Sequence, residues 1–141
     1  MNLAQWLTRR AAATPERPAL FDGHELVANY RAFDARARGL AAWLQDQGVQ
    51  PGDRVGIFMK NVPDYLIVFY GIWMAGAAVV PINAKLHGRE AAFIIEDAGI
   101  DLVFASDSLA TALSRANVQA RSIVTPKAAS LKPESRDSHR V

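Results

Sequence analysis

The chain has 141 residues, of which 50% are hydrophobic and 21% are charged, and it contains no cysteine. This length and composition are typical of one globular domain with a hydrophobic core, and they exclude a disordered chain, a disulfide-stabilised fold and a thiolate metal site. The net charge of +2 does not indicate a nucleic-acid partner, because residues 126–141 hold 4 of the 16 basic and 2 of the 14 acidic side chains, which leaves residues 1–125 neutral.

The first two predicted elements are a short helix and a β-hairpin. Apolar residues at helical spacing over residues 3–13 predict an amphipathic helix that Pro15 ends. Within residues 18–29, two apolar runs flank Asp22-Gly23, and Asp-Gly favours the two-residue loop of a hairpin because it tolerates a positive φ. The start of the chain lacks the apolar stretch of a secretory signal, so we expect a cytoplasmic protein.

The next predicted element is a helix over residues 30–47 that Asn29 caps and Gly48 ends. Its pattern places one apolar face toward a core and one polar face in solvent. The predicted core face consists of Phe33, Ala37, Leu40, Ala41 and Leu44. The predicted solvent face includes Arg31, Asp34, Arg38 and Gln45.

The centre of the chain is predicted to be a strand, an apolar helix and a second strand. The first strand covers residues 54–59, and Pro63 suits the first position of the helix that follows. Gly76 can end this helix in a left-handed conformation, and residues 77–82 then form the second strand. Such a βαβ unit is right-handed in nearly all proteins and lays its helix across a parallel sheet.

Residues 65–84 carry no charged side chain, and a stretch of this length can cross a bilayer as a helix. We favour a buried core instead, because Gly71, Gly76 and Pro81 interrupt the segment and no cluster of Lys and Arg marks one flank. The sequence therefore predicts no membrane span.

Helices and strands continue to alternate after the central unit. The predicted elements are a helix over residues 88–99, a strand over 101–105, a helix that Ser106 or Ser108 caps and that ends near Asn117, and a strand over 122–125. The predicted fold is α/β, a mostly parallel sheet with helices on both faces, preceded by an N-terminal helix and a β-hairpin.

We expect one folded region and one disordered region. Residues 1–125 are predicted to form the α/β domain. Residues 126–141 contain a single large aliphatic side chain, Leu131, before the terminal Val141. They cannot bury enough apolar surface to offset the entropy of ordering them, so we expect a polar, disordered tail.

No group of residues in the sequence forms a convincing site for catalysis, a cofactor or a metal. His87 and Glu90 are three residues apart, but a metal needs three or four ligands, so we favour a helix-capping carboxylate. Lys60-Asn61 follows a strand where α/β proteins commonly bind ligands, but without a Gly-rich phosphate loop we favour a solvated connection over an anion site. Glu96-Asp97 point apart on a helix and form no acid–base pair.

Five segments nevertheless form a distinctive series by their order and spacing. They are Tyr30-Arg31-Ala32-Phe33-Asp34, residues 40–44, GVQPGDRVGIFMKNVPDY from Gly48, MAGAAVVPINAKLHGRE from Met74 and IIEDAGIDLVFAS from Ile94. Together, over residues 2–106, they resemble the N-terminal portion of the adenylate-forming, AMP-dependent acyl-CoA synthetases, among them the fatty-acid–CoA ligases.

The resemblance implies ATP-dependent activation of a carboxylic acid to an acyl-adenylate, followed by thioester formation with coenzyme A. The complete family enzyme would use ATP, Mg²⁺ and CoA. The family's Ser/Thr/Gly-rich phosphate loop, its Tyr-Gly-x-Thr-Glu segment, its ribose-binding aspartate and its catalytic lysine have no counterpart in these 141 residues. We therefore expect the chain alone to be catalytically incomplete and to bind none of these ligands.

No catalytic, cofactor-binding or metal-binding residue of the family is carried over to this sequence. The residues that match family positions are expected to form turns and caps in the N-terminal part of the adenylate-forming fold. They are Gly48, Gly52, Asp53, Arg54, Asn61, Gly76, Pro81 and Asn83.

The expected partner is the remainder of a synthetase or a second copy of the chain. An alternative function is a stand-alone interaction or dimerisation module that uses the helix around Trp6 or the surface of the sheet. Because parallel sheets are normally buried on both faces, a partial domain should leave strand surface under-covered and self-associate or pack loosely. The residues expected to be under-covered are Val79, Val80, Ile82, Val103 and Phe104.

Overall fold

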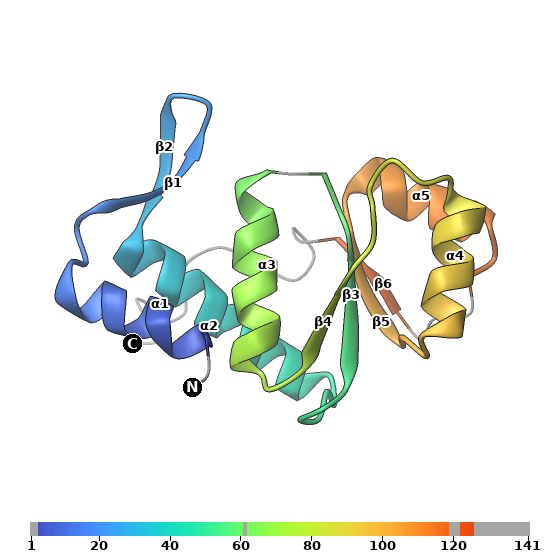
Figure 1. Cartoon of the computed structure of the whole chain (residues 1–141), viewed down its shortest axis with the longest axis horizontal. Coiled ribbons are helices and arrows are strands. Elements are labelled where there is room, and N and C mark those ends of the chain that lie inside the picture. The colour runs from blue at the N-terminus through green and yellow to red at the C-terminus, as the bar shows by residue number, and fades with distance from the viewer. Residues whose placement is uncertain (1–2, 61, 119–121, 126–141) are drawn as a thin grey trace.

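The computed structural model describes residues 3–60, 62–118 and 122–125 (Figure 1). Its helices are α1 (Leu3–Ala13), α2 (Tyr30–Asp46), α3 (Pro63–Met74), α4 (Gly88–Asp97) and α5 (Asp107–Arg115). Its strands are β1 (Pro18–Asp22), β2 (Glu25–Asn29), β3 (Arg54–Phe58), β4 (Ala78–Pro81), β5 (Leu102–Ala105) and β6 (Ser122–Val124). The predicted order of helices and strands is confirmed. The predicted tail over residues 126–141 lies outside the described residues and stays a prediction.

Four strands form a parallel sheet in the order β4-β3-β5-β6. On one side of β3, Val55 lies opposite Val79 of β4. On the other side, Ile57 lies opposite Phe104 of β5. The connection from β3 through α3 to β4 is the predicted βαβ crossover, and β3 is the strand around which the sheet is built.

Helices cover both faces of this sheet, as predicted (Figure 1). On the face covered by α2 and α3, Ile57 and Phe104 are fully buried in one hydrophobic cluster. On the face covered by α4 and α5, Val103 and Leu113 are fully buried in a second cluster. The neighbours Val103 and Phe104 belong to different clusters because successive strand residues point to opposite faces.

The expectation that β5 would be under-covered is wrong. Val103 and Phe104 have no exposed surface, and Ile82 is only 4% exposed. The reason is that β5 lies between β3 and β6 and has helices on both faces. Val79 and Val80 on β4, at an edge of the described sheet, do remain partly exposed.

The β1–β2 hairpin projects from the end of the molecule that carries α1 (Figure 1). Its turn is Gly23-His24, one residue later than predicted, because Asp22 still pairs with Glu25. Gly23 has a φ of 64°, in the left-handed region that glycine favours. Phe21 and Leu26 face each other in the hairpin register and are 50% and 52% exposed.

The predicted core face of α2 is confirmed, but one residue of its predicted solvent face is buried. The carboxylate of Asp34 accepts hydrogen bonds from the Thr8 hydroxyl at 3.1 Å and from Arg38 Nε at 2.7 Å. Thr8 belongs to α1, which packs across this part of α2 and covers Asp34. The local helical pattern cannot indicate this, because the covering helix lies more than 20 residues away in the chain.

The predicted ends of α2 are also present. The Asn29 side-chain oxygen accepts a hydrogen bond from the Ala32 N–H at 2.9 Å, which is the predicted N-cap. Gly48, with a φ of 92°, follows the last turn, and the Val49 N–H donates to the Leu44 carbonyl. At α5, Ser106 occupies the N-cap position, as predicted. Its side chain, however, makes no capping hydrogen bond.

The uncharged segment over residues 65–84 divides between α3 and β4, as the sequence favoured. α3 has 12 residues. Among the helices formed by the described residues, none combines the length and the apolar character that a membrane crossing requires.

A connected group of aromatic rings joins α1, α2 and α3. The Trp6 ring centroid lies 6.2 Å from Tyr30 and 6.3 Å from Tyr70. The Tyr70 ring meets Phe33 and Trp73 edge to face, each at 5.3 Å. Burial, and to a lesser degree the neighbouring Tyr30, raises the pKa of the Tyr70 phenol above its ordinary value.

We expect Gly71→Ala to lower the free energy of unfolding by about 1–3 kcal/mol in urea denaturation. A Cβ at Gly71 would lie 2.7 Å from Leu40 Cδ2 and 2.9 Å from Leu40 Cβ, and the fully buried Leu40 has little room to move. The matched control is Gly39→Ala in α2, where nothing lies within 4 Å of an added Cβ. There the better helix propensity of alanine should stabilise the fold by about 0.5–1 kcal/mol. Equal stability of Gly71→Ala and wild type would contradict this close helix contact.

We expect Tyr70→Phe to reduce the loss of stability at alkaline pH. The raised pKa means that the folded state holds the Tyr70 proton more tightly than the unfolded state. This contribution is fully present below the unfolded pKa, about 10, and is lost as the pH rises through the folded pKa. Urea denaturation of wild type and Tyr70→Phe, at neutral pH and above pH 10, measures this loss of stability. The same alkaline loss in both proteins would show that Tyr70 ionisation does not contribute.

Candidate functional site

A hollow of about 680 Å³ lies at the carboxyl ends of β3 and β4, which is the edge where open α/β sheets commonly bind ligands. We call it the strand-end pocket. Its residues come from the end of β3, the first turn of α3 and the segment after β4. They are Met59, Lys60, Tyr65, Pro81, Ile82, Asn83, Ala84 and Lys85.

The local sequence explains how the strand-end pocket forms. The Ile82 N–H donates to the Ile57 carbonyl at 2.8 Å, so the two strands stay side by side up to the pocket. The chain then turns at Asn83, whose side-chain oxygen accepts the Lys85 N–H at 2.9 Å and whose carbonyl accepts the Leu86 N–H at 3.1 Å. Asn83 is therefore a turn residue, which is the role that the family match implied.

The charges of the strand-end pocket lie on its rim. Lys60 and Lys85 are exposed, whereas the buried residues Met59 and Ile82 are apolar. Asp64, in the first turn of α3, places a negative charge near the same edge and opposes an anion there. The solvated connection favoured for Lys60 agrees with this arrangement, and its neighbour Asn61 lies outside the described residues. The pocket offers an apolar hollow with solvated charges, and its described lining residues include no fully buried ionisable group of the kind typical of catalytic sites.

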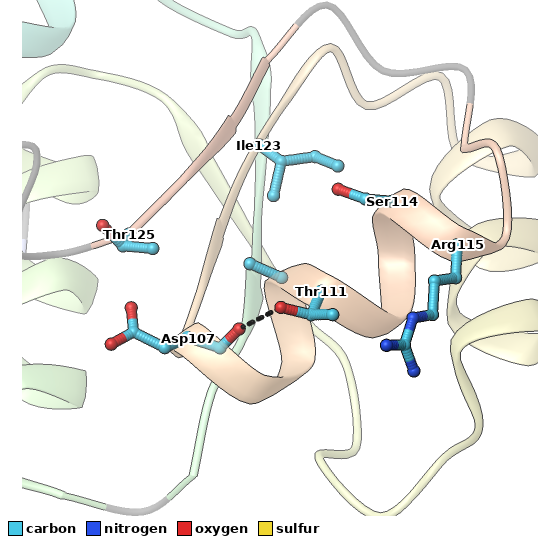
Figure 2. A pocket seen from close by; sticks show the side chains of 7 residues that line it. Asp107, Thr111, Ser114, Arg115, Ile123 and Thr125 are labelled. Atoms are coloured by element: carbon cyan, nitrogen blue, oxygen red, sulfur yellow. Dashed lines mark hydrogen bonds between the residues drawn. The ribbon is translucent and has the colours of Figure 1, made fainter.

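A second hollow, of about 550 Å³, lies between α5 and β6 (Figure 2). Figure 2 shows the Asp107 carboxylate and the Arg115 guanidinium at opposite ends of this hollow. The Thr111 hydroxyl donates to the Asp107 carbonyl at 3.2 Å, so it is used within its own helix. These side chains are spaced along one helix face and do not assemble a nucleophile with a base.

A smaller hollow, of about 310 Å³, lies between α1 and α2 and includes Thr8, Arg38 and Met74. Its charged group, Arg38, pairs with Asp34, and Thr8 donates to the same carboxylate. Thr8 therefore links α1 to α2 through its hydroxyl.

The acidic residues that the sequence singled out have structural positions. Glu90 Oε1 accepts the His87 N–H at 3.0 Å, which confirms the predicted capping carboxylate of α4. Glu96-Asp97 lie in the last turn of α4. Among residues 3–60, 62–118 and 122–125, no group of three His, Cys, Asp or Glu side chains lies close enough to hold a metal ion.

Most of the described residues that match family positions form turns and caps, as expected, but Arg54 begins β3 and Pro81 ends β4. Asp53 Oδ2 accepts the Gln50 N–H at 2.8 Å and closes the turn before β3. The Gly52 N–H donates to the Gly76 carbonyl at 3.0 Å and links the turns that precede β3 and β4. Arg54 Nη1 donates to the Ala98 carbonyl at 2.7 Å, at the C-cap of α4.

Two residues of the strand-end pocket, Tyr65 and Lys85, were not singled out in the sequence. The available signal is their position: Tyr65 lies in the first turn of the helix after β3, and Lys85 follows β4 closely. Because the carboxyl ends of adjacent parallel strands lie at the same edge of a sheet, the predicted βαβ unit already implied that these segments meet.

Comparison with known families and structures identifies the chain. The sequence profile of the family described as AMP-binding enzyme matches residues 7–140. The match extends beyond the segments over residues 2–106 that carry the resemblance.

Two relatives and one solved structure show what part of the family the chain resembles. It is 36% identical over 112 residues to 2-succinylbenzoate–CoA ligase of Geobacillus sp. (strain WCH70), covering 77% of this chain and 22% of that protein. It is 33% identical over 103 residues to long-chain-fatty-acid–CoA ligase FadD13 of Mycobacterium tuberculosis, covering 72% of this chain and 20% of that protein. The inhibitor-bound N-terminal domain of FACL13 from M. tuberculosis superposes with a TM-score of 0.82 at 27% identity, covering 91% of this chain and 34% of that one.

The chain thus spans about a fifth of the length of these two ligases. Its fold is the one found in the N-terminal domain of a fatty acyl-CoA synthetase. The chain belongs to the AMP-binding enzyme family and resembles the N-terminal part of its acyl-CoA ligases.

Proposed function

We propose that the chain is the N-terminal scaffold of an ATP-dependent acyl-CoA synthetase, which converts a carboxylic acid, ATP and CoA into acyl-CoA, AMP and pyrophosphate. The observation that carries this proposal is the family match over residues 7–140, which coincides with the fold of the FACL13 N-terminal domain. In the reaction, a carboxylate oxygen attacks the α-phosphorus of ATP and pyrophosphate leaves. The CoA thiol then attacks the acyl carbonyl and AMP leaves.

The role of this chain in that reaction is to support and position the rest of the enzyme. Its 141 residues contain no Ser/Thr/Gly-rich phosphate loop, and the described residues group no acidic side chains for Mg²⁺. ATP, Mg²⁺ and CoA would therefore be held by residues outside this chain. The chain alone should have no adenylation activity.

For the substrate acid, the proposal extends only to its reacting group, a carboxylate. The named relatives act on 2-succinylbenzoate and on long-chain fatty acids, which share a carboxylate and differ in the rest of the molecule. We propose that the substrate is a carboxylic acid of intermediary metabolism and that the reaction takes place in the cytoplasm. Fatty acids are the first class of acid to test.

ATP–pyrophosphate exchange tests this function. The purified 141-residue chain should give no exchange above the protein-free blank with a long-chain fatty acid, 2-succinylbenzoate or benzoate. Co-expression with a FadD13 polypeptide that lacks the 103 matched residues should produce exchange that neither polypeptide gives alone. Robust exchange by the chain alone would contradict the scaffold role. Failure of the co-expressed pair to give exchange with any of the acids would contradict the synthetase assignment.

A second candidate function is an interaction or dimerisation module. One observation favours it, namely that several large hydrophobic side chains are exposed in the described part of the chain. They are Trp6, Phe21, Leu26, Val62, Leu66 and Phe93. The downstream gene sequence separates the two candidates, because an adjacent reading frame that encodes a Ser/Thr/Gly-rich phosphate loop favours the synthetase.

A further inference from the structure

α3 is apolar on the side that faces away from the core as well as on the side that faces it. Its buried residues are Ile67, Val68, Gly71 and Ile72. The other side carries the N-cap residue Val62 and the helix residues Tyr65, Leu66, Phe69 and Trp73, which we call the α3 stripe. Tyr65 and Phe69 also touch the edge of the core, and Val62 and Leu66 are the exposed members. At about 100° per residue, these five positions fall within about 100° of the helix circumference.

The α3 stripe is a formed surface of contacting rings. Phe69 lies 6.2 Å from Tyr65 in a stacked arrangement and 4.5 Å from Trp73 edge to face. All three rings are partly buried. Val62 and Leu66, beside them, are 42% and 44% exposed. The stripe therefore combines ordered aromatic side chains with aliphatic side chains that remain open to solvent.

Such a surface is unusual for a helix that faces water. A helix on the surface of a domain normally has a polar outer face, whereas a helix that is apolar all round is normally buried. Asp64 is the only charged residue in α3, and it lies at the N-terminus. By contrast, the exposed Phe93 of α4 is a single apolar side chain on a helix that also carries Arg89, Glu90, Glu96 and Asp97. A single exposed apolar residue of this kind needs no partner, but a continuous stripe indicates one.

The comparisons indicate the partner. Nearly all of this chain, 91%, superposes on the FACL13 N-terminal domain, yet it accounts for only 34% of that chain. About two-thirds of the FACL13 chain therefore lies outside the matched region and has to pack against it somewhere. Of the stripe residues, Tyr65 alone lines the strand-end pocket, and the others lie outside the hollows described above, which suits a packed layer more than an enclosed small ligand.

We propose that the α3 stripe is the surface on which the remainder of the AMP-binding domain packs, as an apolar layer of helices or sheet. This inference rests on the proposed function in one respect, namely that such a remainder exists in the working enzyme. It concerns assembly and not catalysis, so it is tested without ATP or an acid.

The absence of cysteine allows the stripe to be probed with single thiols. Leu66→Cys places a thiol in the stripe, and Phe93→Cys places a matched thiol on α4, at a side chain that is 67% exposed. Each 141-residue variant is labelled with a maleimide, first alone at several concentrations and then co-expressed with the remainder of FadD13 or of the Geobacillus ligase. Mass spectrometry assigns the label to this chain.

In the isolated chain we expect both thiols to react rapidly at every concentration. In the co-expressed complex, labelling of Leu66→Cys should slow by about tenfold or more, because it then requires local opening of the interface. Labelling of Phe93→Cys should change by less than about twofold. A second pair of variants extends the test: Leu66→Glu should prevent co-purification with the remainder, whereas Phe93→Glu should not. Circular dichroism of the isolated variants verifies that both remain folded.

Several outcomes would overturn the proposal. Slow labelling of Leu66→Cys in the isolated chain at all concentrations would show that the chain covers its own stripe. Protection that grows with concentration would assign the stripe to a second copy. A complex in which Leu66→Cys stays reactive would show that the remainder packs elsewhere on the chain. Failure of the chain to co-purify with either remainder would show that the remainder is not its partner. Protection without pyrophosphate exchange would contradict the proposed catalytic function and leave this inference standing.

Discussion

The structure depends on one constraint, the need of a parallel sheet to be buried on both faces. β3 has a parallel neighbour on each side, so its backbone groups are paired and its side chains point alternately into two cores. Ile57 meets the face covered by α2 and α3, and Phe58 meets the face covered by α4 and α5. The helices are placed by this requirement, and the close approach of α2 and α3 at Gly71 follows from it.

The residues that match family positions support this arrangement through backbone and side-chain hydrogen bonds. Gly52 and Gly76 link the turns before β3 and β4, and Arg54 joins the start of β3 to the C-cap of α4. Asn83 closes the turn where the chain leaves β4. Gly52, Gly76 and Arg54 act at the amino ends of β3 and β4, whereas Asn83 lies at the carboxyl end of β4, the edge at which α/β proteins commonly bind ligands. Residues without catalytic chemistry can therefore mark an enzyme family by holding both ends of its strands in place.

Part of the apolar surface that this chain leaves open lies on a helix, α3. A partial α/β domain was expected to leave strand surface under-covered. Val79 and Val80 at the β4 edge do remain partly exposed, but β5 is fully enclosed and the α3 stripe leaves apolar side chains open on a helix. In a layered α/β protein each helix layer has two sides, one against its own sheet and one against whatever lies beyond it. The proposed packing of the remainder of the domain on the α3 stripe would account for a helix that is apolar on both sides.

The sequence by itself determined the order of helices and strands, the βαβ unit, the N-cap Asn29 and the family, because these features depend on local periodicity, turn chemistry and spacing. It also determined that Glu90 caps a helix. Only the tertiary structure decided that Asp34 is buried and that β5 is enclosed. Each of these depends on which distant element packs against a residue, and a local pattern shows which residues are apolar or polar but does not show what covers them.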